Sequence, residues 1–380
     1  MNERTTASAL SSGLAVVVLL VLSSITAWGG EAQANASPTD SAAKTVMVHP
    51  KLGGFILGFD VDQDGTEGLL SEYLHLQDGN IDAATEVFDQ NTGKILNVIA
   101  EKKDTQDDYV TEGIFDHIGL ADFQTVVGGF AKNHYMTLDP IGANKFTGKW
   151  TPPIKKNYFL QGISNNRDGS DVAVVQFSDI EEILLYVFRS NISTNSFGPL
   201  MPFNDGNIGF PLVAYDSKRN AAVIVGSNGS PTTPPLIATV DLANGKIQEF
   251  TGAGVGNVLG LAVDSSTDVA VLTTQGGPLT PPMVDFYNVV KQTGFSVTLP
   301  GSNVGADVEF DPVHKLFVVA AGDASTGTVS LFEYDSNGIL NKTISGGSLN
   351  SLTGCCVLNP ATRTGFGVVG FSAGLQSFSY

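Results

Sequence analysis

The stretch Gly260-Leu-Ala-Val-Asp-Ser-Ser-Thr-Asp-Val-Ala-Val271 decides the fold, because its pattern returns along the chain at a fixed interval. An apolar run ends at Asp264, a short polar turn follows, and a second apolar run begins. Apolar runs end in the same way at Asp216, Asp311 and Asn359, so that the four positions are separated by 48, 47 and 48 residues. One hairpin cannot bury both of its faces without neighbours. The sequence therefore predicts a stack of repeated β-hairpins.

A second marker extends the repeat upstream, namely a turn glycine between the later strands of each unit. It recurs at Gly93, Gly142, Gly198, Gly245, Gly294 and Gly338. The last unit, from Thr353 to Tyr380, has room for three strands, and the unassigned strand-like segment Thr45–His49 can supply a fourth. These observations predict an all-β, seven-bladed β-propeller of four-stranded antiparallel blades, with its ring closed by the N- and C-terminal strands. An open β-solenoid is the alternative, and units of this length fit it less well.

The N-terminus has the pattern of a secretory signal peptide. The apolar run Leu14–Leu22 follows Arg4 and precedes Ala32-Gln-Ala34, so we expect cleavage after Ala34; an uncleaved anchor is the alternative. We expect residues 1–34 to be the signal peptide, residues 35–44 a flexible lead-in and residues 45–380 a single propeller domain. The protein is then secreted or periplasmic, with no stable membrane span after cleavage.

Composition narrows the partners. The chain of 380 residues has a formal net charge of −18, which makes nucleic acid an unexpected partner. The 43 glycines and the charged fraction of only 15% suit short strands joined by tight turns. We therefore expect a protein or a small molecule as the ligand.

Two of the hairpins resemble those of known propellers. Asp311-Pro-Val-His-Lys-Leu-Phe-Val-Val-Ala320 resembles the hairpin of the YVTN-repeat and lactonase-like propellers, and the stretch at Gly260 is similar to that of NHL-type propellers. The resemblance covers about four of the seven expected blades. It implies the propeller fold and an extracytoplasmic setting, and it carries over no catalytic residue.

An aspartate-rich loop predicts a metal site. Asp60, Asp62 and Asp64 occupy positions one, three and five of a loop in which Thr66 offers a carbonyl at position seven, a spacing that can wrap Ca²⁺ in oxygen ligands. The loop resembles those of EF-hands and integrin-type blades, but Gly68 and Ser71 stand at its ninth and twelfth positions. A further ligand would have to be Glu67, Glu72 or water. The alternative is that Asp60 caps a turn, as Asp216 does.

The only two cysteines, Cys355 and Cys356, are neighbours in the sequence. In an exported protein they are candidates for a vicinal disulfide, which would present a sulfur surface for a ligand close to the channel. The alternative is a pair of reduced thiols that fill a strand.

Three carboxylates alternate in Asp307-Val-Glu309-Phe-Asp311 and so share one side of an inner strand. Asp307 and Glu309 are candidates for a general base or a channel metal ligand. Amides of a neighbouring blade that satisfy these groups are the other interpretation.

We expect a non-enzymatic binding or scaffold propeller for a protein or small-molecule ligand, with Ca²⁺ as a stabilising ion. The alternative function is a lactonase-like, metal-assisted hydrolase with its site at the channel, since the fold alone does not separate the two.

Overall fold

The computed structural model describes residues 45–380 with gaps, namely 62–64, 76–80, 101–107, 117–121, 130–136, 143–144, 147–157, 167–169, 180–184, 192–195, 198–200, 204–208, 228–231, 253, 276–280, 300–303, 324–327, 353 and 370–373. The expected signal peptide and lead-in, Asp62 and Asp64 lie outside the described residues. The described part is all-β, apart from one short 3₁₀ helix, η1 (Gly347–Ser351).

Within the described ranges the strands form seven antiparallel sheets, six of them with four strands. The first sheet holds β2 (Phe55–Val61), β3 (Glu67–His75), β4 (Ile81–Asp89) and β5 (Ile95–Ala100). The second holds β6 (Asp108–Asp116), β7 (Asp122–Gly129), β8 (Thr137–Gly142) and β9 (Lys145–Phe146). The third has five strands, β10 (Tyr158–Asn166), β11 (Ser170–Asp179), β12 (Leu185–Asn191), β13 (Ser196–Phe197) and β14 (Met201–Phe203), because β13 and β14 both pair with β12.

The later sheets follow the repeat read from the sequence. The fourth holds β15 (Gly209–Asp216), β16 (Ala221–Ser227), β17 (Leu236–Asp241) and β18 (Ile247–Thr251). The fifth holds β19 (Val258–Asp264), β20 (Val269–Thr274), β21 (Met283–Asn288) and β22 (Thr293–Thr298). The sixth holds β23 (Val304–Asp311), β24 (Leu316–Asp323), β25 (Thr328–Tyr334) and β26 (Leu340–Ser345).

The seventh sheet joins the two ends of the chain. Its order is β1-β29-β28-β27, with β1 (Met47–Val48), β27 (Gly354–Asn359), β28 (Thr364–Val368) and β29 (Leu375–Ser379). Met47 lies opposite Gln376 and Val48 opposite Leu375, so the predicted pairing of the N-terminal segment with the last strand is confirmed. The backbone N–H of Ser377 also donates to the carbonyl oxygen of Val46 (2.9 Å).

Two glycines let other segments approach β1 closely. A Cβ at Gly93, in the turn between β4 and β5, would lie 1.9 Å from the carbonyl oxygen of Met47. A Cβ at Gly374, just before β29, would lie 2.0 Å from the carbonyl oxygen of Val48. Both glycines have a positive φ, which other residues rarely adopt. The short β1 is therefore enclosed by backbone on two sides.

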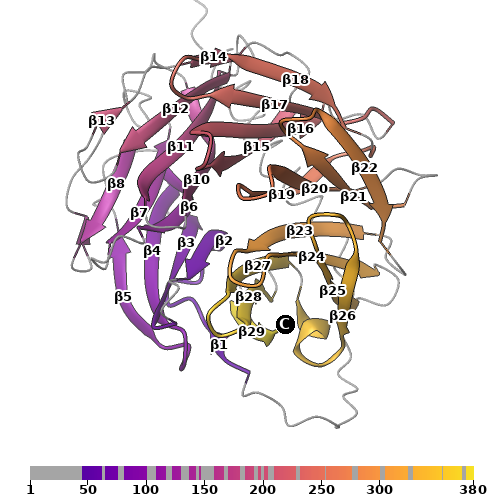
Figure 1. Ribbon diagram of the computed structural model, residues 1–380. Helices are drawn as coiled ribbons and strands as arrows, with labels where there is room; N and C mark the ends of the chain where they lie inside the picture. The colour runs from indigo at the N-terminus through magenta and orange to yellow at the C-terminus, as the bar shows by residue number, and fades with distance from the viewer. Residues whose placement is uncertain are drawn as a thin grey trace, which may run out of the picture.

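Neighbouring sheets contact one another through their first strands. β2 contacts β6, β6 contacts β10, β10 contacts β15, and the series continues through β19 and β23 to β27, which in turn contacts β2. Figure 1 shows these strands toward the middle of the view and the fourth strands, such as β5, β18 and β22, toward its outside.

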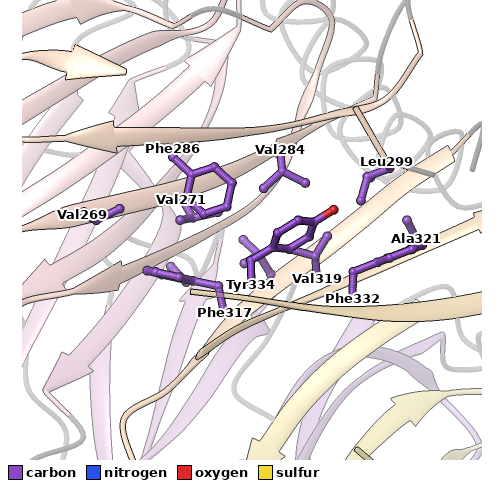
Figure 2. Packing of buried hydrophobic residues seen from close by; sticks show 12 residues of the cluster. Val269, Val271, Val284, Phe286, Leu299, Phe317, Val319, Ala321, Phe332 and Tyr334 are labelled. Carbon is purple, nitrogen blue, oxygen red and sulfur yellow. The ribbon is translucent and has the colours of Figure 1, made fainter. Parts of the chain in front are cut away.

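The core lies between facing sheets. Figure 2 shows the cluster between the fifth and sixth sheets, where Phe286, Phe317 and Tyr334 meet edge to face with ring centroids 6.3 and 5.7 Å from Phe286. A second cluster joins the first sheet to the seventh, and there the ring of Phe88 meets that of Phe366 at 5.4 Å. Apolar side chains from facing sheets fill these spaces, so each of these sheets needs its neighbours to bury its faces.

The repeated aspartates end their strands by accepting turn hydrogen bonds. The Oδ1 atom of Asp264 accepts the backbone N–H of Ser266 (2.9 Å), and Oδ1 of Asp311 accepts those of Val313 (2.9 Å) and His314 (2.8 Å). The predicted turn glycine is wrong in one unit. Gly294 lies inside β22, and the residue with positive φ in that turn is Gln292.

Candidate functional site

The three acids of the inner strand β23 lie on the side that faces the seventh sheet. Asp307, Glu309 and Asp311 pair with Ala320, Val318 and Leu316 of β24, so they share one face as predicted. Asp311 is fully buried, whereas Asp307 and Glu309 are half-buried. The hydrogen bonds of Asp307 and Asp311 show that this face meets β27 and the residues near it.

Asp307 joins two neighbouring inner strands. Its Oδ1 accepts the backbone N–H of Val308 (2.7 Å), and its Oδ2 accepts the backbone N–H of Cys356 on β27 (3.0 Å). On its other side β19 comes so close that a Cβ at Gly260 would lie 2.6 Å from Asp307 Oδ1. Both carboxylate oxygens therefore accept backbone amides, which is a bridging role between strands.

Asp311 is the centre of a buried network with the C-terminal residue. Its Oδ2 accepts the hydroxyl of Tyr380 (3.1 Å) and Nη1 of Arg363 (3.4 Å), and it lies 2.8 Å from Nδ1 of His314. Nη2 of Arg363 also donates to Glu333 (2.5 Å). Burial, reinforced by the charge of Asp311, raises the pKa of the Tyr380 hydroxyl well above its ordinary value. This network fixes the end of the chain to the sixth sheet.

Polar contacts also join other neighbouring sheets at the ends of their strands and in the turns that follow. Lys218 of the fourth sheet pairs with Asp268 of the fifth (2.8 Å). Ser336 of the sixth sheet donates to Asp264 of the fifth (3.1 Å). Asn359 of the seventh donates to Gln90 of the first (3.3 Å), so this series of contacts also crosses between the last sheet and the first.

Cys356 is buried, with 3% of its surface exposed, in the cluster between the sixth and seventh sheets. The side chain of Cys355 lies outside the described residues. The vicinal disulfide therefore remains a prediction, and the position of Cys356 beside Asp307 places it on an innermost strand, as the repeat register predicted.

In the described part of the aspartate-rich loop, β2 and β3 pair as antiparallel strands up to Val61 and Gly68. Asp60 pairs with Leu69 and is buried, and its Oδ1 lies 2.8 Å from the backbone nitrogen of Val61. The carbonyl of Thr66, the expected position-seven ligand, accepts the backbone N–H of Gln90 (3.0 Å). Gly68 of β3, at position nine, packs against Phe88 of β4. Among the described residues no three acidic, histidine or cysteine side chains converge as metal ligands.

Glu72, one of the options for an extra ligand of this loop, makes its hydrogen bond to the linker between β1 and β2. It lies in β3 opposite Ile56, fully buried, on the face that meets the seventh sheet. Its Oε2 accepts the backbone N–H of Gly54 (2.9 Å), and its Oε1 has no hydrogen-bond partner. The side chain is therefore turned toward the linker between β1 and β2.

Glu86 holds the same linker from the next strand. It is fully buried in β4, opposite Leu70, and its carboxylate accepts the backbone N–H groups of Lys51 (3.0 and 2.9 Å) and Leu52 (3.0 Å). Burial is the main cause that raises the pKa of the Glu86 carboxyl. Glu86 was not a sequence-predicted site residue, and Glu72 was considered only as an extra ligand of the aspartate-rich loop. The available signal was an acid within an otherwise apolar strand pattern, at Leu69-Leu-Ser-Glu72 and at Glu86-Val-Phe88.

Large apolar side chains are exposed on the turn edge of the fifth and sixth sheets. Phe295 is 45% exposed although its ring stacks on Phe286 (5.1 Å), and Ile339 is 59% exposed. The turn at Gly338, which precedes Ile339 in the chain, contacts the Phe295 ring. Single exposed apolar side chains of this kind are common on protein surfaces.

No protein-family model matches this sequence, and a search of curated proteins finds no match. Across the described part of the chain, no helix has the length and apolar character needed to cross a membrane.

Proposed function

We propose that this chain is an exported seven-bladed β-propeller that acts as a binding or scaffold module for a protein or a small molecule. The observation that carries the proposal is the engagement of the inner-strand acids. Asp307 and Asp311 use their oxygens to join the sixth sheet to the seventh, which leaves them as parts of the scaffold. The resemblance to YVTN-repeat and NHL-type hairpins supports an extracytoplasmic scaffold of this kind.

The contacts between first strands support a closed ring of seven blades. They run from β2 through β23 to β27, and from β27 to β2. The pairing of β1 with β29 gives the seventh sheet its fourth strand from the opposite end of the chain. Closure of this kind removes sheet edges that would otherwise be open to aggregation.

A metal-assisted hydrolase of the lactonase-like type is the competing function. It would require Asp307 and Glu309 to hold a metal or to act as a base at the channel. The bridging hydrogen bonds of Asp307 favour the binding module instead.

Calcium and the vicinal disulfide belong to the same proposal as supporting features. Ca²⁺ would be held by Asp60, Asp62, Asp64 and the carbonyl of Thr66, which also accepts the backbone N–H of Gln90. A Cys355–Cys356 disulfide would place a rigid sulfur surface on β27. Intact-mass measurement after denaturing alkylation without reductant tests the disulfide, and the addition of two alkyl groups would contradict it.

The test of function is a thermal-shift screen of the mature protein against small molecules, followed by analysis of each ligand after incubation. A binding module returns its ligand chemically unchanged. The wild type and an Asp307→Asn/Glu309→Gln double variant are also assayed for lactone hydrolysis with Ca²⁺, Mg²⁺, Mn²⁺ or Zn²⁺. We expect background rates from both proteins. Metal-dependent turnover that the double variant loses would establish the hydrolase and reject the binding module.

A further inference from the structure

Carboxylates hold the linker between β1 and β2. Residues 49–54 leave the seventh sheet after β1 and enter the first sheet at Phe55. The backbone N–H groups of Lys51 and Leu52 donate to Glu86, and that of Gly54 donates to Glu72. Those hydrogen bonds tie the connection between the N-terminal strand and the first sheet to two buried acids.

The two acids share one face of the first sheet. Glu72 lies opposite Ala84 in β4, and Glu86 lies opposite Leu70 in β3, so the two glutamates are diagonal neighbours across the β3–β4 pair. Their surroundings are apolar, since this face packs on Val357, Phe366 and Leu375 of the seventh sheet. Two carboxylates at such a site repel one another when both are ionised.

The balance of hydrogen bonds distinguishes the two. Both oxygens of Glu86 accept N–H donors, whereas Oε1 of Glu72 is buried without a partner. An ionised carboxylate with one unpartnered oxygen in an apolar site is costly, and a proton on that oxygen removes the charge. In the folded protein, Glu72 is therefore the glutamate that carries a proton, while Glu86 accepts the N–H groups of the linker.

Other charged groups near this face are few. Lys51, on the linker, is exposed and interacts with Glu86, and His49 is exposed at the end of β1. The described residues of β27, β28, β29 and β1 bring no ionisable side chain to the cluster. Asp60 of β2 pairs with Leu69 and so lies on the other face. The strand β6, which contacts β2, β3 and β4, carries Asp108, Glu112 and Asp116, whose side chains lie outside the described residues.

We propose that Glu72 and Glu86 form a proton-dependent latch on residues 51–54, which holds the linker when Glu72 is protonated and loosens it when Glu72 is ionised. The latch acts where the linker that follows β1 enters the first sheet, so its release weakens the join between the first and last sheets. It requires only the pairing of β1 with β29 and does not depend on which ligand the protein binds.

The pH range follows from the position of the group. Burial raises the pKa of Glu72 to about 7, the N–H of Gly54 partly offsets this effect, and the charge of Glu86 adds to it. The folded chain then holds this proton more tightly than the unfolded chain does, so the stability is greatest below about pH 4.5 and falls as the pH rises to about 7. For this group alone, the full change corresponds to about a 300-fold increase in the unfolding equilibrium constant.

Amide hydrogen exchange tests the latch in the full-length mature protein. The exchange of Lys51, Leu52 and Gly54 is measured from pH 5.5 to 8.5 and corrected for intrinsic rates. We expect their protection to fall about tenfold between pH 5.5 and 7 and to level off above pH 7, which is within the limit set by the proton linkage. The Glu72→Gln variant keeps an acceptor for Gly54 and should show protection that does not change with pH.

The matched control is Glu333→Gln, which changes a buried glutamate that is paired with Arg363. It should leave the wild-type pH transition of the linker in place. A flat profile in the wild type would overturn the proposal, and so would a transition that persists in Glu72→Gln. Because the wild-type measurement needs no substitution, the proposal can be rejected even if Glu72→Gln fails to fold.

Discussion

The linkers that enter the first and fifth sheets are held in the same way but with different chemistry. Asp285 of β21 accepts the backbone N–H of Gly254 (2.7 Å), as Glu86 of β4 accepts those of Lys51 and Leu52. In both sheets the acid is in the third strand, opposite Leu70 or Leu272 of the second. An inward acid that fixes the entering linker is thus a device that this chain uses at least twice.

The second strand makes the difference. Thr274 of β20 stands where β3 has Glu72, opposite the residue that precedes the bulge in the first strand. The hydroxyl of Thr274 is also buried without a partner, but it is neutral and does not titrate. Asp285 gains a second donor from Ser296 (2.5 Å). Burial raises the pKa of the Asp285 carboxyl, and its two donors oppose that effect. The fifth sheet thus has one acid with a donor on each oxygen, whereas the first has two adjacent acids and an unpartnered oxygen.

The largest effect should come from removal of β1, the strand that precedes the linker into the first sheet. Deletion of residues 35–50 should lower the melting temperature sharply or cause aggregation, because β29 becomes an edge and Leu375 loses its cover. Thermal unfolding and light scattering measure this effect. Deletion of residues 35–44 alone leaves β1 intact and should change little. An unchanged melting curve for the longer deletion would contradict closure by β1.

Loss of the clamping acid should have the next largest effect. Glu86→Ala leaves two backbone N–H groups without acceptors and should lower the free energy of unfolding by about 2–5 kcal/mol. Asp285→Ala leaves one N–H and one hydroxyl and should cost about 1–3 kcal/mol. Denaturant unfolding gives both values. If Asp285→Ala exposed residues 51–54 to hydrogen exchange as much as Glu86→Ala does, the local clamp would be the wrong explanation.

Substitutions at two glycines distinguish the cost of a clash with β1 from the cost of backbone strain at a positive φ. Gly93→Ala should cost about 2–4 kcal/mol, since its Cβ would lie 1.9 Å from the carbonyl oxygen of Met47. Gly346 has a similar positive φ, 83° against 72°, and open space around it, so Gly346→Ala should cost only about 1 kcal/mol. Equal losses for the two variants in denaturant unfolding would show that β1 does not lie against Gly93.

The smallest effect concerns the aspartate-rich loop of the first sheet, which has no counterpart at Asp264 in the fifth. If Asp62 and Asp64 bind Ca²⁺, millimolar Ca²⁺ should raise the melting temperature of the wild type by a few degrees, on the order of 1 kcal/mol in stability. Asp62→Ala should abolish that response. The same rise in both proteins would exclude the loop as the site.

The strand ends could be predicted from the sequence because the signal is local. An Asp or Asn that ends a strand accepts the N–H group of a residue two or three positions further along the chain, as Asp264 does with Ser266. The same residue type therefore recurs wherever the same turn is made. The pairing of β1 with β29 was predicted by elimination, since the last unit lacked one strand. Gly294 failed as a marker because Gln292 adopts the left-handed conformation in that turn.

The site could be predicted only in part because its contacts are long-range. The alternation in Asp307-Val-Glu309 predicted a shared face, but only the structure shows that Asp307 accepts the amide of Cys356, 49 residues away. Glu72 followed an aspartate-rich loop in the sequence and was therefore considered as a ligand. Its orientation depends on which face of the first sheet meets the seventh, and a period-two pattern does not reveal that.

The most direct test of the central claim is a cross-link across the β1–β29 pair. Met47 and Gln376 lie opposite each other beside the Ser377–Val46 hydrogen bond, in the closely spaced type of antiparallel pair that suits a disulfide. In a background with Cys355 and Cys356 replaced by Ser, a Met47→Cys/Gln376→Cys protein should form an intramolecular disulfide that is visible as faster migration on a non-reducing gel. A Met47→Cys/Leu375→Cys protein, with its side chains on opposite faces, should not. Equal cross-linking in both proteins, or none in the first, would contradict closure of the fold by its N-terminal strand.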